Sequence, residues 1–250
     1  MPNKPVALVT GANQGIGLQI AKDLVGHGFT VLVGARNLAN GETAAKSIGA
    51  DAHAIQLDVT DSKSIAAAAD RIAKDYGKLD VLMNNAGISH VGKAGGRMED
   101  VARKSRLSVA PLDEIRAIYD VNVFGVIAVT QAMIPLLRKS SAPRIVNVSS
   151  GVGSLARTLG PGGEHLREIF GAYSISKAAL NSITVGFAIE LEKEGIKVNG
   201  ACPGFTKTAL NNFQGTKTVE EGAREPVRLA LLGPDGPTAT YSNDEGPLPW

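Results

Sequence analysis

Short apolar stretches alternate with longer amphipathic stretches along most of the chain. The first apolar stretch, Val6–Thr10, is rich in β-branched residues and predicts a buried strand. The stretch after it, 15–26, places Ile16, Ile20 and Leu24 on one side of a helix. The same alternation predicts further strands at 30–35, 53–58, 79–84, 144–149, 197–202 and 239–242, and further helices at 41–48, 62–76, 112–138 and 172–194.

Alternation of helices with near-continuous apolar strands is typical of a parallel sheet that is covered on both faces. We therefore predict an α/β fold, a doubly wound parallel sheet of the Rossmann type, in a single domain over residues 1–250. Two added segments, about 88–111 and about 151–170, interrupt the pattern. Because each follows a predicted strand, we expect loops or short helices at the carboxyl edge of the sheet, where such folds bind ligands.

The composition argues against several classes of protein. Lys and Arg number 26 against 24 Asp and Glu, a net charge of +2, so we expect no nucleic-acid partner and no membrane partner. A single cysteine cannot form an internal disulfide, and no His, Asp or Glu spacing indicates a metal site. The N-terminal residues lack the apolar region of a signal peptide, and no apolar run reaches the ~18–20 residues of a spanning helix, so we expect a cytoplasmic location.

Glycine is abundant, with 29 residues in 250, and three glycines stand in the turn between the first strand and the first helix. Gly11 can adopt backbone angles that other residues avoid, Gly15 lets a phosphate approach the main chain, and Gly17 lets the helix pack closely on the strand. The N–H groups at the helix start then favour a pyrophosphate. The alternative is a plain tight turn, because the spacing is not the general G-x-G-x-x-G.

The residue after the second predicted strand indicates which dinucleotide is bound. Folds that bind NAD place Asp or Glu there to accept from the ribose 2′-hydroxyl, whereas this chain has Gly34-Ala35-Arg36. An arginine can pair with a 2′-phosphate, and no carboxylate is present to repel it. The sequence therefore favours NADP(H) over NAD(H), the alternative being an arginine that simply faces solvent.

Tyr173 and Lys177 are four residues apart in a predicted helix, so both side chains lie on one side of it. An ammonium group beside a phenol favours the phenolate and lowers the pKa of the phenol toward a useful acid–base range. The pair alone is weak evidence, since two solvated surface residues would show the same spacing. Polar residues at the carboxyl ends of other predicted strands, such as Ser149-Ser150 and Asn84–Gly87, strengthen it.

Together these motifs make the chain resemble the short-chain dehydrogenase/reductase family over almost its whole length. The motifs that occur in family order are Thr10–Gly17, Asp58-Val59, Asn84–Gly87, Asn122, Ile145–Ser150, Tyr173–Lys177 and Pro203–Thr208. The 23-residue separation of Ser150 and Tyr173 is similar to that of the family's carbonyl reductases with an insertion before the catalytic tyrosine, which are commonly monomeric. We expect a monomer or a homodimer.

The resemblance implies roles for individual residues. Tyr173 would be the general acid, Lys177 would lower its pKa and hold the nicotinamide ribose, and Ser150 would bind the substrate carbonyl. Asn122 would hold a water that relays protons to Lys177. Asp58 would contact the adenine, residues 85–87 would line the adenine-ribose side, and two threonines of the last motif would hold the carboxamide. The cofactor-binding residues would be Gly11, Asn13, Gln14, Gly15, Ile16, Gly17, Arg36, Asp58, Val59, Asn85, Ala86, Gly87, Tyr173, Lys177, Pro203, Gly204, Thr206 and Thr208.

The expected activity is NADPH-dependent reduction of a ketone or aldehyde, which is reversible alcohol oxidation. Reduction places hydride on carbon and leaves charge on oxygen, which two hydroxyls and an ammonium group can stabilise and protonate. One alternative is reduction of an activated C=C or C=N bond on the same scaffold. Another is an NADP-binding sensor without catalysis, which would not need Tyr173, Lys177, Ser150 and Asn122.

Overall fold

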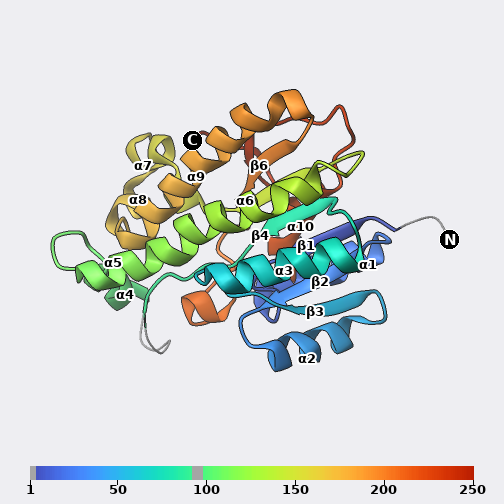
Figure 1. Ribbon diagram of the computed structural model, residues 1–250. Coiled ribbons are helices and arrows are strands. Elements are labelled where there is room, and N and C mark those ends of the chain that lie inside the picture. Colours follow the sequence, from blue (N-terminus) through green and yellow to red (C-terminus); the bar gives the residue numbers. More distant parts are fainter. Residues whose placement is uncertain (1–3, 92–97) are drawn as a thin grey trace.

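Eight strands form one sheet in the computed structural model, which describes residues 4–91 and 98–250 (Figure 1). Their order in the sheet is β3-β2-β1-β4-β5-β6-β7-β8. The strands are β1 Val6–Val9, β2 Thr30–Ala35, β3 Ala52–Gln56, β4 Val81–Asn84, β5 Arg144–Val148, β6 Lys197–Ala201, β7 Tyr241–Asn243 and β8 Gly246–Pro247. Every pairing is parallel except that of β7 with β8. The predicted doubly wound parallel sheet is confirmed, and the short antiparallel β8 at its edge is an addition to the prediction.

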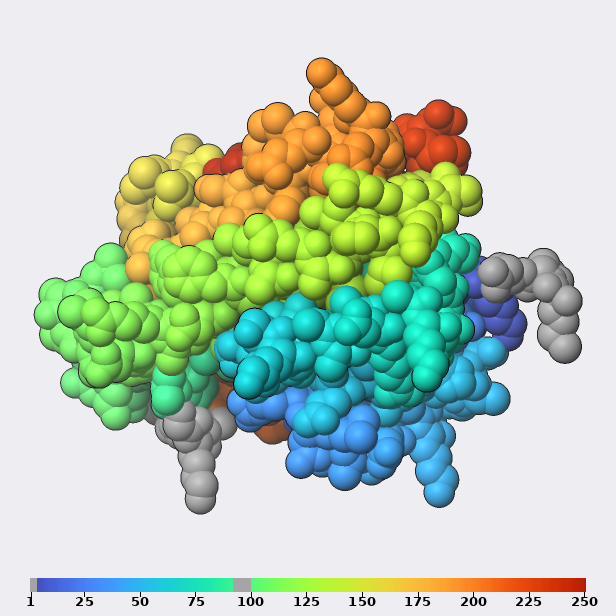
Figure 2. All heavy atoms as spheres, viewed as in Figure 1, coloured from blue at the N-terminus to red at the C-terminus, as the bar shows by residue number. Residues whose placement is uncertain are grey.

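Helices cover both faces of the sheet. They are α1 Gly15–Gly26, α2 Leu38–Ile48, α3 Ser62–Asp75, α4 Met98–Lys104, α5 Leu112–Tyr119, α6 Gly125–Leu137, α7 Leu155–Leu159, α8 Glu164–Glu168, α9 Ala172–Leu191 and α10 Val219–Ala230. Figures 1 and 2 show α3, α6 and α9 side by side over one face. In β1, Val6 and Leu8 pack toward that layer, whereas Ala7 and Val9 pack toward α1, α2 and α10. The two-residue period of a strand therefore divides the core into two layers.

Helices α2 and α10 differ from the prediction. The helix α2 begins three residues before the predicted Gly41, because the Asn37 side chain accepts a hydrogen bond from the N–H of Asn40 and caps the helix there. The helix α10 was not predicted. Thr218 and Glu221 form a reciprocal capping box at its start, and Pro226 lies inside it.

The long segment from α5 to α6 is one continuous helical rod with a π-helical turn, η1 (Asp120–Phe124), in its middle. The span Leu112–Leu137 is long and apolar enough to cross a membrane by length and composition alone, a test that core helices of folded domains also meet. Half of its most apolar window is buried inside the fold, where Val129 and Met133 pack against the sheet. The absence of a membrane partner stays a prediction.

The two added segments begin at the carboxyl edge of the sheet, as expected. The first follows β4 and contains α4, and its Gly-rich centre, residues 92–97, lies outside the described residues. The second follows β5 and folds into a 3-10 turn, η2 (Gly151–Gly153), and the short helices α7 and α8. Both therefore flank the edge at which the site residues gather.

Candidate active site

The glycine-rich turn between β1 and α1 has the backbone shape that its glycines were predicted to allow. Gly11 and Gly15 have φ angles of 63° and 57°, in the left-handed region that favours glycine. A Cβ on Gly11 would lie 3.0 Å from the Cα of Ala86, at the end of β4. The turn is thus pressed against the next motif of the site.

Gly17 is required for a different reason from the predicted one. A Cβ there would lie 2.4 Å from the Asn85 side-chain nitrogen and 2.6 Å from the carbonyl oxygen of Gly11. The close approach is therefore to the turn itself and to Asn85. The same amide nitrogen donates to the carbonyls of Thr10 and Gly11, at 2.9 and 3.2 Å.

Thr10, the first residue of the predicted Thr10–Gly17 motif, completes this link and had no predicted role of its own. Its hydroxyl oxygen accepts hydrogen bonds from the backbone N–H groups of Asn85 and Ala86, both at 3.0 Å. Thr10 itself is 1% exposed. Together Thr10 and Asn85 hold the ends of β1 and β4 in one rigid unit.

The start of α1 is suited to a pyrophosphate. Its N-cap, Gln14, is exposed and makes no side-chain capping bond, and the first turn carries no acidic residue. The neighbouring Asn13 and Ile16 are half-buried. An uncapped helix N-terminus beside a left-handed glycine turn presents N–H groups and a positive dipole to an anion.

Arg36 and Asp58 line one hollow of about 590 Å³ beside the ends of β2 and β3, together with Gln56 and Lys63. Within the described part of the chain, the exposed Arg36 guanidinium forms no hydrogen bond or ion pair with another side chain, so it can pair with an added phosphate. Asp58 accepts from both the N–H and the hydroxyl of Thr60 through one carboxylate oxygen, which leaves its other oxygen available.

Val59 packs against the start of α6, where a Cβ on Gly125 would lie 2.9 Å from its methyl carbon. The side chain is half-buried and belongs to the apolar layer on the α3–α6–α9 side of the sheet. Contact with a nucleotide through Val59 stays a prediction.

Gly87, Asn122 and Lys177 meet at the centre of the site. A Cβ on Gly87 would lie 3.2 Å from the Asn122 side-chain oxygen and 3.6 Å from Lys177 Nζ. Asn122 lies in the π turn η1, which interrupts the α-helical register at this residue. Its amide donates to the Ile88 carbonyl and the Ser176 hydroxyl, at 2.8 and 3.0 Å, and its oxygen accepts from the Ile88 N–H at 2.9 Å.

These three bonds describe Asn122 as a brace between the segment after β4 and helix α9. The side-chain amide of Asn122 binds these protein groups. That Asn122 also holds a water for Lys177 stays a prediction.

Tyr173 and Lys177 occupy the first turns of α9, on one side of the helix as predicted. The Lys177 side chain is 4% exposed, its ammonium donates to the Val148 carbonyl at 2.8 Å, and it lies 5.7 Å from the centroid of the Tyr173 ring. Because Val148 ends β5, this bond ties α9 to the strand that leads into Ser150.

The pKa of Tyr173 differs from the expectation. Burial raises it above the usual value, and a hydrogen bond with Ser150 opposes that rise only in part. Burial also lowers the pKa of Lys177 to about 8. Without nucleotide, the surroundings therefore keep the Tyr173 phenol protonated, as a general acid requires. They also favour the uncharged form of Lys177, the residue that was expected to lower the pKa of Tyr173.

Ser150 follows β5 and is held on both sides. On one side Ser149, whose N–H donates to the Ala201 carbonyl at 2.7 Å, also bonds to the Asn181 side chain. On the other side the N–H of Gly151 donates to the sulfur of Cys202 at 3.1 Å, and that cysteine is 4% exposed. Ser149 and Cys202 are thus core residues, and both position the backbone around Ser150.

The loop after β6 brings the last predicted residues to the site. Gly204 has a φ of 73°, and the Thr206 hydroxyl, which is buried, donates to the Pro203 carbonyl at 3.0 Å. A Cβ on Gly15 would lie 3.4 Å from the Thr208 methyl carbon, so this loop reaches the phosphate turn. The predicted carboxamide contacts of the two threonines stay predictions.

Sequence reasoning also missed a buried amide network behind the site. The Asn84 amide donates to Thr130 on α6 and to Asn147 on β5, at 3.1 and 2.9 Å, and Asn147 donates to Thr184 on α9 at 2.9 Å. An asparagine inside an apolar strand was the available signal, because a buried amide needs partners. Among the described residues, no group of three His, Cys, Asp or Glu is placed to hold a metal ion.

Comparisons with curated proteins place this arrangement among known enzymes. The profile of the short chain dehydrogenase family matches residues 5–218. The chain is 38% identical over 239 residues to the short-chain dehydrogenase anuI of Penicillium roqueforti, covering 92% of this chain and 90% of that protein. It is 34% identical over 290 residues to salutaridine reductase of Papaver somniferum (94% and 93% covered) and 33% identical over 277 residues to (+)-neomenthol dehydrogenase of Arabidopsis thaliana (90% and 91% covered).

Solved structures agree. The structure of salutaridine reductase from Papaver somniferum matches with a TM-score of 0.80 at 32% identity, covering 95% of this chain and 99% of that one. A ketoacyl-(acyl-carrier-protein) reductase from Brucella melitensis in complex with NADH gives 0.80 at 26% identity, with 96% of each chain covered. A short chain dehydrogenase from Shigella flexneri in complex with NADP gives 0.79 at 27% identity, with 97% and 98% covered.

Proposed function

The chain belongs to the short-chain dehydrogenase family, and from that premise we propose that it catalyses the NADP(H)-dependent reduction of a ketone or aldehyde to an alcohol. The observation that carries the proposal is the convergence of three groups at one point. The Lys177 ammonium binds the last carbonyl of β5 and lies 5.7 Å from the centroid of the Tyr173 ring. Ser150 follows that strand two residues later, and its hydroxyl lowers the pKa of Tyr173 against the effect of burial.

The names of the relatives support the same chemistry. They include reductases of salutaridine and of a ketoacyl group and a dehydrogenase of an alcohol, neomenthol. Carbonyl reduction and alcohol oxidation are one reaction in two directions. A non-catalytic sensor has no use for the buried Lys177, whose ammonium binds a backbone carbonyl and lies over the Tyr173 ring.

NADP(H) fits the residues present. The turn at Gly11–Gly17 and the uncapped start of α1 would hold the pyrophosphate, and the hollow lined by Arg36, Lys63 and Asp58 would hold the adenosine end. Relatives have been solved with NADH and with NADP. Here Arg36 follows β2, no carboxylate stands at the end of that strand, and the guanidinium has no side-chain partner among the described residues, which favours the 2′-phosphate.

The protein's own groups account for the rest of the reaction. When bound, the nucleotide supplies the hydride that is added to the carbonyl carbon. The Ser150 hydroxyl donates a hydrogen bond to the carbonyl oxygen, and Tyr173 transfers its proton to that oxygen as negative charge develops there. Lys177, in its charged form, stabilises the phenolate that Tyr173 becomes, and Asn122 keeps the surrounding segments in register.

The test is NADPH consumption by the wild type and by Tyr173→Phe across a panel of ketones and aldehydes. We expect Tyr173→Phe to lose about 10²–10⁴-fold in kcat while its Kd for NADPH, measured by fluorescence titration, stays within about threefold of the wild type. Full activity in Tyr173→Phe would refute the proton-transfer role. If the folded wild type binds NADPH but reduces no carbonyl compound, the result would favour the non-catalytic sensor or an enzyme that reduces a C=C or C=N bond.

We further propose that residues 1–250 act as one NADP-binding reductase domain, cytoplasmic and either monomeric or homodimeric. All described strands share one sheet, which supports a single unit. Light scattering during size-exclusion chromatography separates the two oligomeric states, and a tetramer would contradict both.

A further inference from the structure

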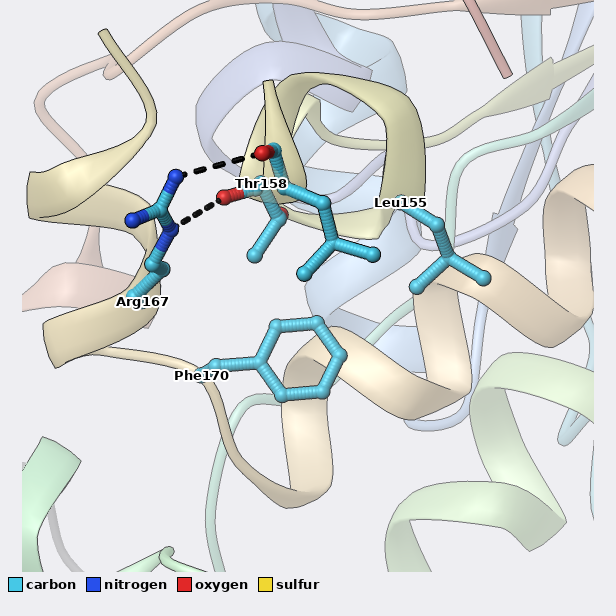
Figure 3. A pocket seen from close by; sticks show the side chains of 5 residues that line it. Leu155, Thr158, Arg167 and Phe170 are labelled. Atoms are coloured by element: carbon cyan, nitrogen blue, oxygen red, sulfur yellow. Dashed lines mark hydrogen bonds between the residues drawn. The ribbon is translucent and has the colours of Figure 1, made fainter. Parts of the chain in front are cut away.

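A second hollow, of about 390 Å³, lies in the added segment between Ser150 and Tyr173. Its lining comes from α7 and α8 and from Phe170, which precedes α9. The residues that line it are Leu155, Thr158, Leu159, Arg167 and Phe170. Figure 3 shows the Phe170 ring and the Leu155 side chain turned toward the same open space.

From this hollow we infer the substrate class: the enzyme takes ketones or aldehydes that carry a bulky, uncharged apolar ring system remote from the carbonyl, and the α7–α8 hollow binds that ring. The inference rests on the proposed carbonyl reductase function and adds which part of the substrate the enzyme recognises. The volume of the hollow lies in the range of small-molecule sites, about 300–1,000 Å³.

The chain itself ties the hollow to the reacting groups. A Cβ on Gly153 would lie 2.6 Å from the carbonyl carbon of Lys177, so the η2 turn packs directly on the catalytic helix. Leu155 is two residues beyond this contact, which limits its Cα to about 7 Å from that of Gly153. Phe170 is three residues before Tyr173 and is limited in the same way to about 11 Å. Two lining residues of the hollow therefore lie within a short chain distance of the segments that carry Lys177 and Tyr173, which is the reach that a ring remote from the carbonyl would span.

The hollow offers apolar contact and little free polarity. The Thr158 hydroxyl donates to the Ser154 carbonyl at 2.9 Å. Arg167 donates through Nε to the Thr158 carbonyl at 2.8 Å and through Nη2 to the Leu159 carbonyl at 3.2 Å (Figure 3). Its Nη2 also donates to the Gly160 carbonyl at 3.2 Å. These bonds fix α8 against the end of α7 and occupy the Nε and Nη2 donors of Arg167, so this side chain acts as a clamp between the two helices.

The apolar side chains are held in place but not covered by the chain. Leu155 is 50% exposed and Leu159 is 76% exposed. The Ser154 hydroxyl caps α7 and donates to the Pro249 carbonyl at 2.7 Å, which anchors the helix to the end of the sheet. Exposed leucines on a rigid support beside an active site gain most from an apolar ligand, because burial of such side chains is favourable.

The test compares three ketones that share one reacting ring: cyclohexanone, and the derivatives with a phenyl or a carboxylate group at the carbon opposite the carbonyl. In the wild type we expect kcat/KM for the phenyl ketone to exceed that for cyclohexanone by roughly 10–100-fold. The carboxylate ketone should be no better than cyclohexanone. In Phe170→Ala and Leu155→Ser the phenyl advantage should fall to about threefold or less.

The control is Ile169→Ala. Ile169 is 43% exposed, adjoins Phe170 and does not line the hollow, so its variant should keep the phenyl advantage. Turnover of cyclohexanone should stay within about twofold of the wild type in Ile169→Ala. A Kd for NADPH within about twofold of the wild type in all three variants separates a pocket effect from loss of fold.

Three results would overturn the inference: a phenyl advantage near one in the wild type, an advantage that survives both pocket variants, or a preference for the carboxylate ketone. In each case turnover of cyclohexanone still supports carbonyl reduction. If the wild type reduces none of the three ketones and no other ketone or aldehyde of the panel, the proposed function fails, and the pocket is decided by calorimetric binding of the phenyl ketone to the NADP⁺ complex. Binding that Phe170→Ala weakens and Ile169→Ala does not would support the pocket, and equal binding to all would refute it.

Discussion

Replacement of Lys177 by methionine should stabilise the protein near neutral pH while it abolishes catalysis. The Lys177 side chain is 4% exposed, and the hydrogen bond of its ammonium to the Val148 carbonyl does not offset the loss of water around the charge. Burial accordingly lowers the pKa of Lys177 from 10.5 to about 8. Methionine keeps most of the length of the side chain and carries no charge.

The magnitude follows from the pKa and the hydrogen bond. A fall of the pKa from 10.5 to about 8 corresponds to roughly 3 kcal/mol by which the fold disfavours the charged side chain. Loss of the bond to the Val148 carbonyl removes about 1 kcal/mol of stability. The net gain for Lys177→Met is about 2 kcal/mol in the free energy of unfolding at pH 7, or about 4–8 °C in Tm for a chain of this size.

The gain should depend on pH with a definite sign. Below pH 8 Lys177 is charged in both states, so the wild type bears the full penalty. Between about pH 8 and 10.5 the folded state releases the proton while the unfolded state keeps it, so the stability of the wild type rises relative to the variant. Above 10.5 both states are neutral and the variant keeps no advantage from charge.

The assay is denaturant unfolding, from pH 6.5 to 10, of the wild type, Lys177→Met and the control Lys193→Met, without added nucleotide. Lys193 is exposed, so its variant should change the free energy of unfolding by less than about 0.5 kcal/mol at every pH. A Lys177→Met protein that is less stable than the wild type at pH 7, or a stability difference that does not shrink between pH 8 and 10, would show that burial does not govern this lysine.

Two further predictions concern the nucleotide site. Arg36→Ala should raise KM for NADPH about 10–100-fold and leave KM for NADH within about twofold, because the guanidinium would pair with the 2′-phosphate. Steady-state kinetics measure both constants, with the exposed Arg116→Ala as the control, and equal effects on the two nucleotides would contradict the prediction. Gly17→Ala should lower the free energy of unfolding by about 1–3 kcal/mol and weaken NADPH binding, because the added Cβ would lie 2.4 Å from the Asn85 side chain. In the control Gly26→Ala, on the same helix, the added Cβ meets nothing within 4 Å, so that variant should be neutral or stabilising. Equal unfolding curves for the two variants would refute the argument.

The elements that apolar periodicity predicts well are those whose buried face is purely apolar. The helix α1 was predicted at its observed bounds, since Ile20 and Leu24 are fully buried and no polar residue interrupts that face. The helix α10 escaped prediction because Pro226 and the buried Glu225 stand on its inner side. Glu225 is held there by Arg228 and Ser242, a set of partners that no local pattern reveals. The capping box of Thr218 and Glu221 was the one local signal available.

The candidate site was predictable as a set of motifs but not as a set of energies. Spacing placed Tyr173 and Lys177 on one side of a helix, and the structure confirms it. The direction of the pKa shift of Tyr173 could not be predicted, because it depends on how deeply the fold buries the phenol. The bond from Gly151 to Cys202 was equally inaccessible, since it joins residues 51 positions apart.

Helix α9 explains why stability and catalysis compete in this fold. Its buried side changes character along its length: Lys177, Asn181 and Thr184 bind the end of β5, whereas Phe187 and Leu191 pack into the apolar layer farther along. The polar half faces the carboxyl edge, where the reaction needs a buried cation and fixed hydroxyls, and the apolar half supplies the hydrophobic stabilisation. Because one rigid helix carries both halves, the packing of the apolar half holds Lys177 in a position that the charge alone disfavours. Loss of the charge should therefore strengthen the fold, and loss of the apolar half should release the site.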